Sequence, residues 1–371
     1  MSSPLAVCNG CSTHSVSGSD GSVTVNTMRV EPIDLRPFRE GSDSDRRRVA
    51  GQFDHAARTS GFLSISGHGV DPDLLADMLD VTAQFFDRPP AEKMAYFVED
   101  RAANRGYAPE GSEALAYSLG EQDLPTDLFE AFNCGLELTD EQLADPYYAA
   151  RRDTLFAANV WPSEPPEFRE TWLAYLSAVD RVANDVMSAA AVALGMPADH
   201  FVPLLDKGPT VIRANNYQRR SGARDPLPNQ MRMGAHTDYG SITVLLADPV
   251  PGLQIRDDAG RWHDVIPSPG SFIVNVGDLL AEWSNDRWRS TLHRVVPPPP
   301  AADGAVRRRS VAWFQQPNWE AMIECLPTCS DESNPPRYAP VTSGDHLMAK
   351  LMGPRLLEPS TPSARGAERT S

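Results

Sequence analysis

The chain contains the sequence GAHTDYG at residues 234–240 and the sequence STLHRV at residues 290–295. His236 and Asp238 are two residues apart, so on a β-strand both side chains would leave from the same face. His293 would reach them from a distant strand. Two imidazoles and one carboxylate hold a metal on one side and leave the other side open, and these ligands favour Fe(II) and dioxygen chemistry. We interpret the three residues as a catalytic metal site; the alternative is a solvated loop pair beside an unrelated core histidine.

A second polar pair lies in the run RRSVAWF at residues 308–314, which has the composition of a strand. Alternation places Arg308 and Ser310 on one face of that strand. A guanidinium binds a carboxylate through two parallel hydrogen bonds, and a hydroxyl group adds a third. Next to a metal with open positions, this pair indicates a pocket for a 2-oxo acid. The alternative is that Arg307, Arg308 and Arg309 form only a solvated basic turn.

Further motifs surround these residues. They are PIDL at 32–35, GFLSISGHGV at 61–70, NNY at 215–217, GSFIVNVGD at 270–278 and WSN at 283–285. With them the chain resembles the isopenicillin N synthase-like family of the 2-oxoglutarate/Fe(II)-dependent dioxygenases, over most of its length. Two departures stand out: Gln218 occupies a position where plant relatives usually carry proline, and residues 297–304 lengthen the connection between His293 and Arg308.

The resemblance implies an oxidoreductase that hydroxylates, desaturates or cyclises a small-molecule substrate, such as a secondary metabolite, with release of succinate and CO2. Its cofactors would be Fe(2+), the co-substrate 2-oxoglutarate and O2, with ascorbate in a supporting role. The implied metal ligands are His236, Asp238 and His293. The implied co-substrate residues are Arg308, Ser310, Tyr217 and Asn215. The substrate pocket would be lined by the region 105–133, Arg213, Phe314 and Gln316.

Two other hypotheses stay open at this point. One is an Fe(II) oxidase that uses O2 without 2-oxoglutarate, as isopenicillin N synthase does with the same Arg-x-Ser pair. Formation of succinate would separate it from the first hypothesis. The other is a catalytically inactive protein that senses a small acid, although a sensor has no need of open metal positions.

The pattern of the chain predicts a mainly β fold with flanking helices. Helical periodicity covers residues 43–60 and 171–194, and Asp71 with Pro72 begins a further helix that ends before Pro89. Strand-like runs occupy residues 62–66, 242–246, 253–255, 272–276, 291–295 and 310–314. Strands at such regular spacing favour a double-stranded β-helix core of the jelly-roll, cupin-like type.

We divide the chain on composition and pattern. The divisions are a disordered leader at 1–28, an N-terminal dioxygenase region at 29–165, a supporting helix at 166–205, the β-helix core at 206–320, a C-terminal segment at 321–353 and a disordered tail at 354–371. Cys8 and Cys11 form a Cys-x-x-Cys in the leader, which we interpret as reduced thiols without a metal.

The chain has 34 basic and 50 acidic residues, a net charge of −16. This balance argues against nucleic acid and against an anionic membrane surface. No apolar run is long enough to span a bilayer. The five scattered cysteines fit a reducing, cytoplasmic setting, and no protein partner is implied.

Several other polar residues could compete with the proposed ligands. Asp278 is a possible rival carboxylate, but its position favours capping of a helix. His68 lies in a turn and His263 on a strand, where structural hydrogen bonds are the simpler interpretation.

Overall fold

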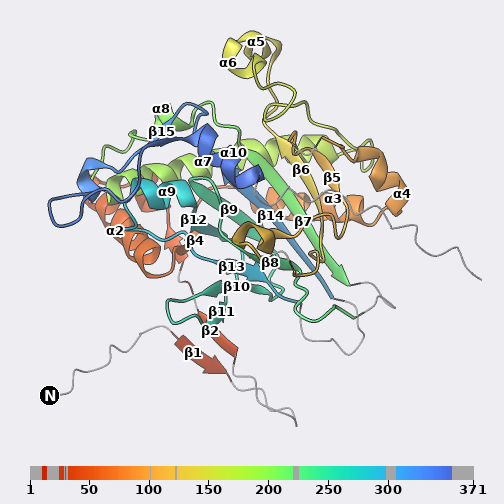
Figure 1. Ribbon diagram of the computed structural model, residues 1–371, viewed down its shortest axis with the longest axis horizontal. Coiled ribbons are helices and arrows are strands. Elements are labelled where there is room, and N and C mark those ends of the chain that lie inside the picture. The colour runs from red at the N-terminus through yellow and green to blue at the C-terminus, as the bar shows by residue number, and fades with distance from the viewer. Residues whose placement is uncertain are drawn as a thin grey trace, which may run out of the picture.

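Two β-sheets form the centre of the protein (Figure 1). The computed structural model describes residues 11–14, 25–28, 30, 32–100, 102–121, 123–219, 225–297 and 306–352. The larger sheet contains, in spatial order, β3 (Pro32–Asp34), β4 (Phe62–Ser66), β12 (Phe272–Val276), β9 (Ile242–Ala247), β14 (Val306–Gln315), β7 (Val211–Arg219), β6 (Glu130–Gly135) and β5 (Gly106–Ala108). The smaller sheet contains β1 (Cys11–His14), β2 (Val25–Met28), β11 (Trp262–Asp264), β10 (Leu253–Arg256), β13 (His293–Val295) and β8 (Met233–His236).

From β7 to β14 the chain winds back and forth between the two sheets. Strands β7, β9, β12 and β14 belong to the larger sheet, while β8, β10, β11 and β13 belong to the smaller one. This winding is a double-stranded β-helix, so the predicted core is confirmed. The strand predicted at 291–295 begins only at His293, and the strand predicted at 310–314 extends over Val306–Gln315.

Three amphipathic helices cover the face of the larger sheet that is turned away from the smaller sheet (Figure 1). They are α2 (Asp43–Thr59), α3 (Pro72–Phe86) and α7 (Phe168–Ala193). Ser42 caps α2 in a reciprocal capping box with Asp45, and Asp71 caps α3. All three helices confirm the predicted pattern, although α7 begins at Phe168, ahead of the predicted start.

Burial on both faces explains the apolar strands of the larger sheet. All five residues of β12 and all six of β6 are buried. One apolar cluster packs the helices against this sheet, including Phe85 and Trp172. A second cluster, with Phe62 and Ile255, fills the space between the sheets.

The remaining described elements are short. They are α1 (Arg36–Glu40), α4 (Pro90–Lys93), η1 (Met94–Tyr96), η2 (Leu115–Leu119), α5 (Asp140–Ala144), α6 (Pro146–Ala149), α8 (Val202–Leu205), α9 (Asp278–Trp283), β15 (Met322–Ile323), η3 (Pro327–Cys329), β16 (Val341–Thr342) and α10 (Ser343–Met352). Helices α5 and α6 project from the body of the protein (Figure 1). Within the described ranges, none of the helices has the length and apolar character needed to cross a bilayer.

The segment predicted as a disordered leader contains two strands, so that prediction is wrong there. Strands β1 and β2 pair antiparallel, and Thr27 of β2 pairs with Asp264 at the edge of the smaller sheet. Composition could not reveal these strands, because the unpaired backbone groups of a distant sheet edge supply the partner. Cys8 and the predicted tail at 354–371 lie outside the described residues.

Candidate active site

Neighbouring strands of the smaller sheet bring the two candidate histidines together. Strand β8 ends at His236, β13 begins at His293, and these two residues are registered opposite each other in the antiparallel pair. Asp238 follows β8 by two residues, in the turn that leads to β9. The carboxylate therefore joins the histidines from a turn, whereas alternation had placed it on the strand.

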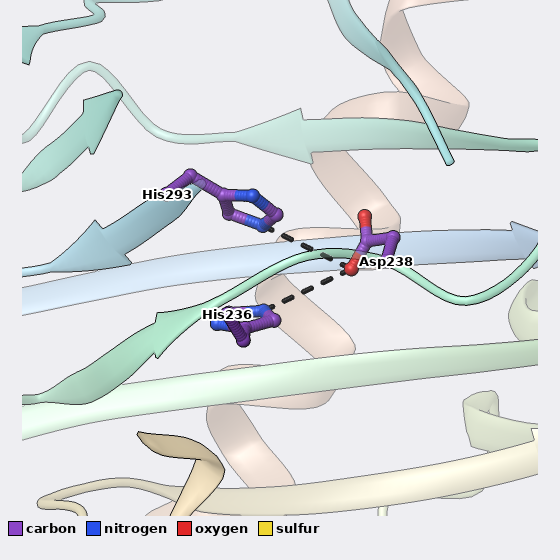
Figure 2. Close-up of side chains that lie close together, drawn as sticks. All are labelled: His236, Asp238 and His293. Carbon is purple, nitrogen blue, oxygen red and sulfur yellow. Dashed lines mark ion pairs between the residues drawn. The ribbon is translucent and has the colours of Figure 1, made fainter. Parts of the chain in front are cut away.

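The three side chains converge on one point (Figure 2). Nε2 of His236 and Nε2 of His293 each lie 3.8 Å from Oδ1 of Asp238. One donor atom from each residue falls within 4.8 Å of the others, and all three side chains are buried. Among the described residues, no other histidine, cysteine, aspartate or glutamate belongs to such a group. A cation placed between these donors would keep an open side, as in non-haem Fe(II) oxygenases.

Backbone carbonyl groups orient both imidazole rings. Nδ1 of His236 lies 2.8 Å from the carbonyl oxygen of Gly234, and Nδ1 of His293 lies 3.0 Å from that of Thr291. Because a carbonyl oxygen only accepts, each Nδ1 carries the proton and donates it. The lone pair of each Nε2 is consequently directed toward the position shared with Asp238.

Two side chains that the sequence did not single out hold the carboxylate. Asn275 Nδ2 and Thr243 Oγ1 donate to Oδ2 of Asp238, at 2.7 and 2.5 Å. Oδ1 is left facing the histidines. Asn275 does interrupt a fully buried apolar strand, and such a residue requires a polar partner. A buried asparagine in an apolar strand was therefore the feature by which the sequence could have indicated this role. The sequence does not identify its partner, because Asp238 lies in a different segment of the chain.

The surroundings set the protonation states that metal binding requires. Burial lowers the pKa of His236, and the nearby His293 lowers it further. Burial would raise the pKa of Asp238, but the two histidines and the hydrogen bonds from Asn275 and Thr243 hold it below its usual value. His236 is thus neutral and Asp238 ionised near neutral pH, the forms that bind a cation.

A cavity of about 780 Å³ connects the three residues with the predicted co-substrate residues. Arg308, Ser310, Tyr217 and Asn215 all line it. Strand register places Arg308 opposite Tyr217 and Ser310 opposite Asn215 on the adjoining strands β14 and β7. The interpretation as a solvated turn is wrong for Arg308, whose exposed fraction is 1%.

The guanidinium of Arg308 has unused hydrogen-bonding capacity. Within the described part of the chain, Nε and Nη1 find no acceptor. The group lies 5.2 Å from the centre of the Tyr217 ring. The side chains of its two neighbours on β14 leave the other face of the strand. Arg307 forms an ion pair with Asp87, and Arg309 forms one with Asp80. Arg308 is therefore the member of the arginine run that faces the cavity.

Asp278 is not the helix cap that the sequence suggested. Gly277 occupies the N-cap position of α9, and Asp278 is the first helical residue. The Asp278 carboxylate forms an ion pair of 2.7 Å with Lys350 and accepts a hydrogen bond from Ser290.

The histidines interpreted as structural do make structural contacts. His68 Nε2 lies 2.9 Å from the carbonyl oxygen of Gly270, and His263 Nε2 lies 2.8 Å from Asp257.

Two family models match the chain, one in its N-terminal part and one over the β-helix core. The family model described as "non-haem dioxygenase in morphine synthesis N-terminal" matches residues 30–164, and that of the 2OG-Fe(II) oxygenase superfamily matches residues 210–317. The 2-oxoglutarate-Fe(II) type oxidoreductase hxnY of Emericella nidulans is 33% identical, covering 84% of this chain and 86% of the relative. A homoarginine-6-hydroxylase of Oryza sativa subsp. japonica is 30% identical, covering 84% and 90%.

Solved structures agree with this relationship. The crystal structure of a full-length Neurospora crassa protein in complex with alpha-KG superimposes with a TM-score of 0.75 at 31% identity, covering 91% of this chain and 98% of that one. The same protein has been solved with alpha-KG and thymine. Small molecules thus bind the relatives, and 2-oxoglutarate with Fe(II) is the cofactor set of the superfamily. The chain belongs to the 2OG-Fe(II) oxygenase superfamily, within its isopenicillin N synthase-like family, and is a 2-oxoglutarate-dependent dioxygenase.

Proposed function

We propose that this dioxygenase oxidises an unactivated C–H bond of a small molecule by hydroxylation, desaturation or ring closure. In the hydroxylation, one atom of O2 enters the product and the other enters succinate, as 2-oxoglutarate loses CO2. The proposed Fe(II) ligands are His236, Asp238 and His293. The proposed 2-oxoglutarate residues are Arg308, Ser310, Tyr217 and Asn215.

The buried guanidinium of Arg308 is the observation that carries this proposal. A charged group with two unpaired N–H donors is costly to bury unless a ligand completes its hydrogen bonds. A carboxylate fits the planar donor fork, and Ser310 two residues along β14 offers a further donor. The far carboxylate of 2-oxoglutarate is such a group, and the cavity gives its other end access to His236 and His293.

The donor set also fits Fe(II). Two neutral imidazole nitrogens and one carboxylate oxygen are the ligands this ion takes in oxygenases with open coordination positions. When bound, Fe(II) supplies the activation of dioxygen. The protein's own contribution is orientation: Gly234 and Thr291 hold the rings, and Asn275 and Thr243 hold the carboxylate.

The test is the response of 2-oxoglutarate turnover to Arg308. Arg308→Lys keeps the charge but loses the fork, so we expect the Michaelis constant for 2-oxoglutarate to rise by about tenfold or more. Arg309→Lys is the matched control, because its side chain leaves the opposite face of β14 and pairs with Asp80. The readouts are succinate release and the visible absorption of the ferrous 2-oxo acid chelate under anaerobic conditions.

An Arg308→Lys variant with the same constant as Arg309→Lys would overturn the assignment of Arg308. Oxygen uptake with substrate but without succinate would instead point to an oxidase that does not use the co-substrate. For the cellular setting we propose the cytoplasm, in line with the free Cys134, Cys325 and Cys329 among the described residues.

A further inference from the structure

The catalytic cavity contains a second group of polar side chains, beyond the residues proposed for 2-oxoglutarate. It consists of Glu113, Asn133 and Arg213, which we call the Arg213 cluster. Arg213 and Asn215 alternate on the same face of β7, so they are about 7 Å apart along the strand. Asn133 on β6 is registered opposite Arg213. Asn215 pairs with Ser310 on the other side of β7. The Arg213–Asn133 pair is therefore two residues along β7 from the Asn215–Ser310 pair.

An ion pair forms the centre of this cluster. Arg213 Nη2 donates to Glu113 Oε1 at 2.7 Å, and Nε donates to Asn215 Oδ1 at 3.1 Å. The two charged side chains are only 12% and 27% exposed. Nε and Nη2 are the donor atoms of Arg213 in these two bonds. These two bonds leave Nη1 of Arg213 and Oε2 of Glu113 unused, and both residues line the cavity.

Two side-chain amides in the cavity wall are buried and have an oxygen atom without a hydrogen-bond partner among the described residues. Asn133 is 4% exposed and Gln316 is 7% exposed. Among the described residues, Asn133 Oδ1 and Gln316 Oε1 find no donor. Neither side chain is used by the metal site or by the proposed 2-oxoglutarate residues. Buried amide oxygens normally have a partner, so these two point to a polar ligand in the cavity.

The charges of the described lining residues balance. Its described lining contains three arginines (Arg105, Arg213, Arg308) and three carboxylates (Asp100, Glu113, Asp238), a formal charge of zero. Fe(II) would add two positive charges and 2-oxoglutarate two negative ones, so the sum over the described lining and both groups stays zero. A substrate with a net charge would bring an uncompensated charge next to the buried side chains of Asn133 and Gln316, which is unfavourable.

We infer that the primary substrate is a small polar molecule without net charge that carries a hydrogen-bond acceptor beside a donor, as an amide or lactam edge does. The acceptor binds Arg213, and the donor binds Glu113 or the amide oxygen of Asn133. This inference rests on the proposed function, because it assigns the substrate end of the same cavity. It makes the Arg213 cluster the part of the site that determines specificity.

The experiment compares substrate-dependent succinate release for three panels of similar size: neutral amides and lactams, monocarboxylic acids, and amines. The wild-type enzyme is expected to turn over members of the neutral panel. Two variants then change the charge of the cluster in opposite directions. Glu113→Gln removes one negative charge and is expected to raise the Michaelis constant of the neutral substrate by about tenfold or more and to favour acids. Asn133→Asp adds one negative charge and is expected to shift the preference toward amines.

Glu121→Gln is the matched control, because it makes the same chemical change at an exposed position shortly after η2 that is not among the described lining residues of the cavity. Opposite shifts in the two variants support recognition, since damage to the fold would lower turnover of every panel alike. Wild-type turnover confined to acids or amines, or parallel losses in both variants, would overturn the inference. Failure of the proposed function is distinguishable, because it appears in the anaerobic chelate spectrum of the Arg308 variants, where no primary substrate is present.

Discussion

Thr243 on β9 lies directly opposite Asn275 on β12, and both side chains donate to the same oxygen of Asp238. This pairing leaves the other carboxylate oxygen facing His236 and His293. The register of β9 against β12 in the larger sheet therefore orients the carboxylate of Asp238. Asp238 itself lies in the turn that follows β8 of the smaller sheet. The partners behind a metal ligand commonly control affinity and activity.

Asn275→Ala removes one of the two donors and lets the Asp238 carboxylate rotate. We expect a loss of about 10- to 100-fold in Fe(II) affinity or in turnover. Thr243→Val should have a similar effect, whereas Thr243→Ser keeps the hydroxyl group and should retain activity. Calorimetric titration with Fe(II) under anaerobic conditions, alongside succinate release, measures both quantities. Equal affinities for the Val and Ser variants would contradict this role.

His236→Ala and Asp238→Ala are expected to abolish turnover, because each removes one of three proposed ligands. His263→Ala is the control: this histidine is also buried, but its hydrogen bond goes to Asp257. Substrate oxidation and uncoupled succinate release are both measured. If uncoupled release survived in His236→Ala, the ligand assignment would be wrong.

Asp127 connects η2 to the strand that carries His236, and it should make stability depend on pH. Its carboxylate accepts from the backbone N–H groups of Leu115 and Gly234, both at 2.9 Å. Burial raises the pKa of Asp127 from 3.8 to about 7. Between these values the folded chain binds a proton that the unfolded chain has released. Stability from this group is therefore complete below pH 3.8 and is lost as the pH rises through 7.

The test compares melting temperatures of the wild type and Asp127→Asn between pH 5 and pH 8. Because the amide does not titrate, the advantage of the wild type should shrink steadily as the pH increases. An advantage that stays constant, or that grows with pH, would show that Asp127 is ionised in the folded protein.

Substitution of Phe85 tests how much the apolar core behind the larger sheet contributes to stability. Its side chain is fully buried and packs against the rings of Tyr107, Phe132 and Phe168. Phe85→Ala should lower the free energy of unfolding by about 3–5 kcal/mol. Gln84→Ala, at an exposed position of the same helix, should change it by less than about 0.5 kcal/mol. Chemical denaturation of both variants measures the difference, and similar values for the two would contradict the packing.

Some of the residues proposed for the chemistry were predictable from short spacings. Arg308 and Ser310 are two residues apart, and alternation along a strand is a local property of the backbone. Asp238 is equally close to His236 in the sequence, but it lies in a turn and not on the strand. The periodicity of α2 and α7 is local in the same sense, because a helix buries one stripe of its own surface. Those signals were sufficient for the helices, the strands of the β-helix core and the Arg308–Ser310 pair, whereas Tyr217 and Asn215 were implied by the resemblance to the family.

Contacts between distant segments had no such signal. The partners of Asp238 depend on the register of β9 against β12, and the ion pair of Glu113 with Arg213 joins a loop to the middle of a strand. Strand β2 reaches the edge of the smaller sheet through Thr27, and β1 pairs with β2. Composition and periodicity describe one segment at a time, whereas register, ion pairing and edge pairing arise when separate segments meet in the folded chain. The chemistry of the metal site could therefore be anticipated residue by residue, while the arrangement that orients it, and the charge balance of its cavity, emerged from the packing of the two sheets.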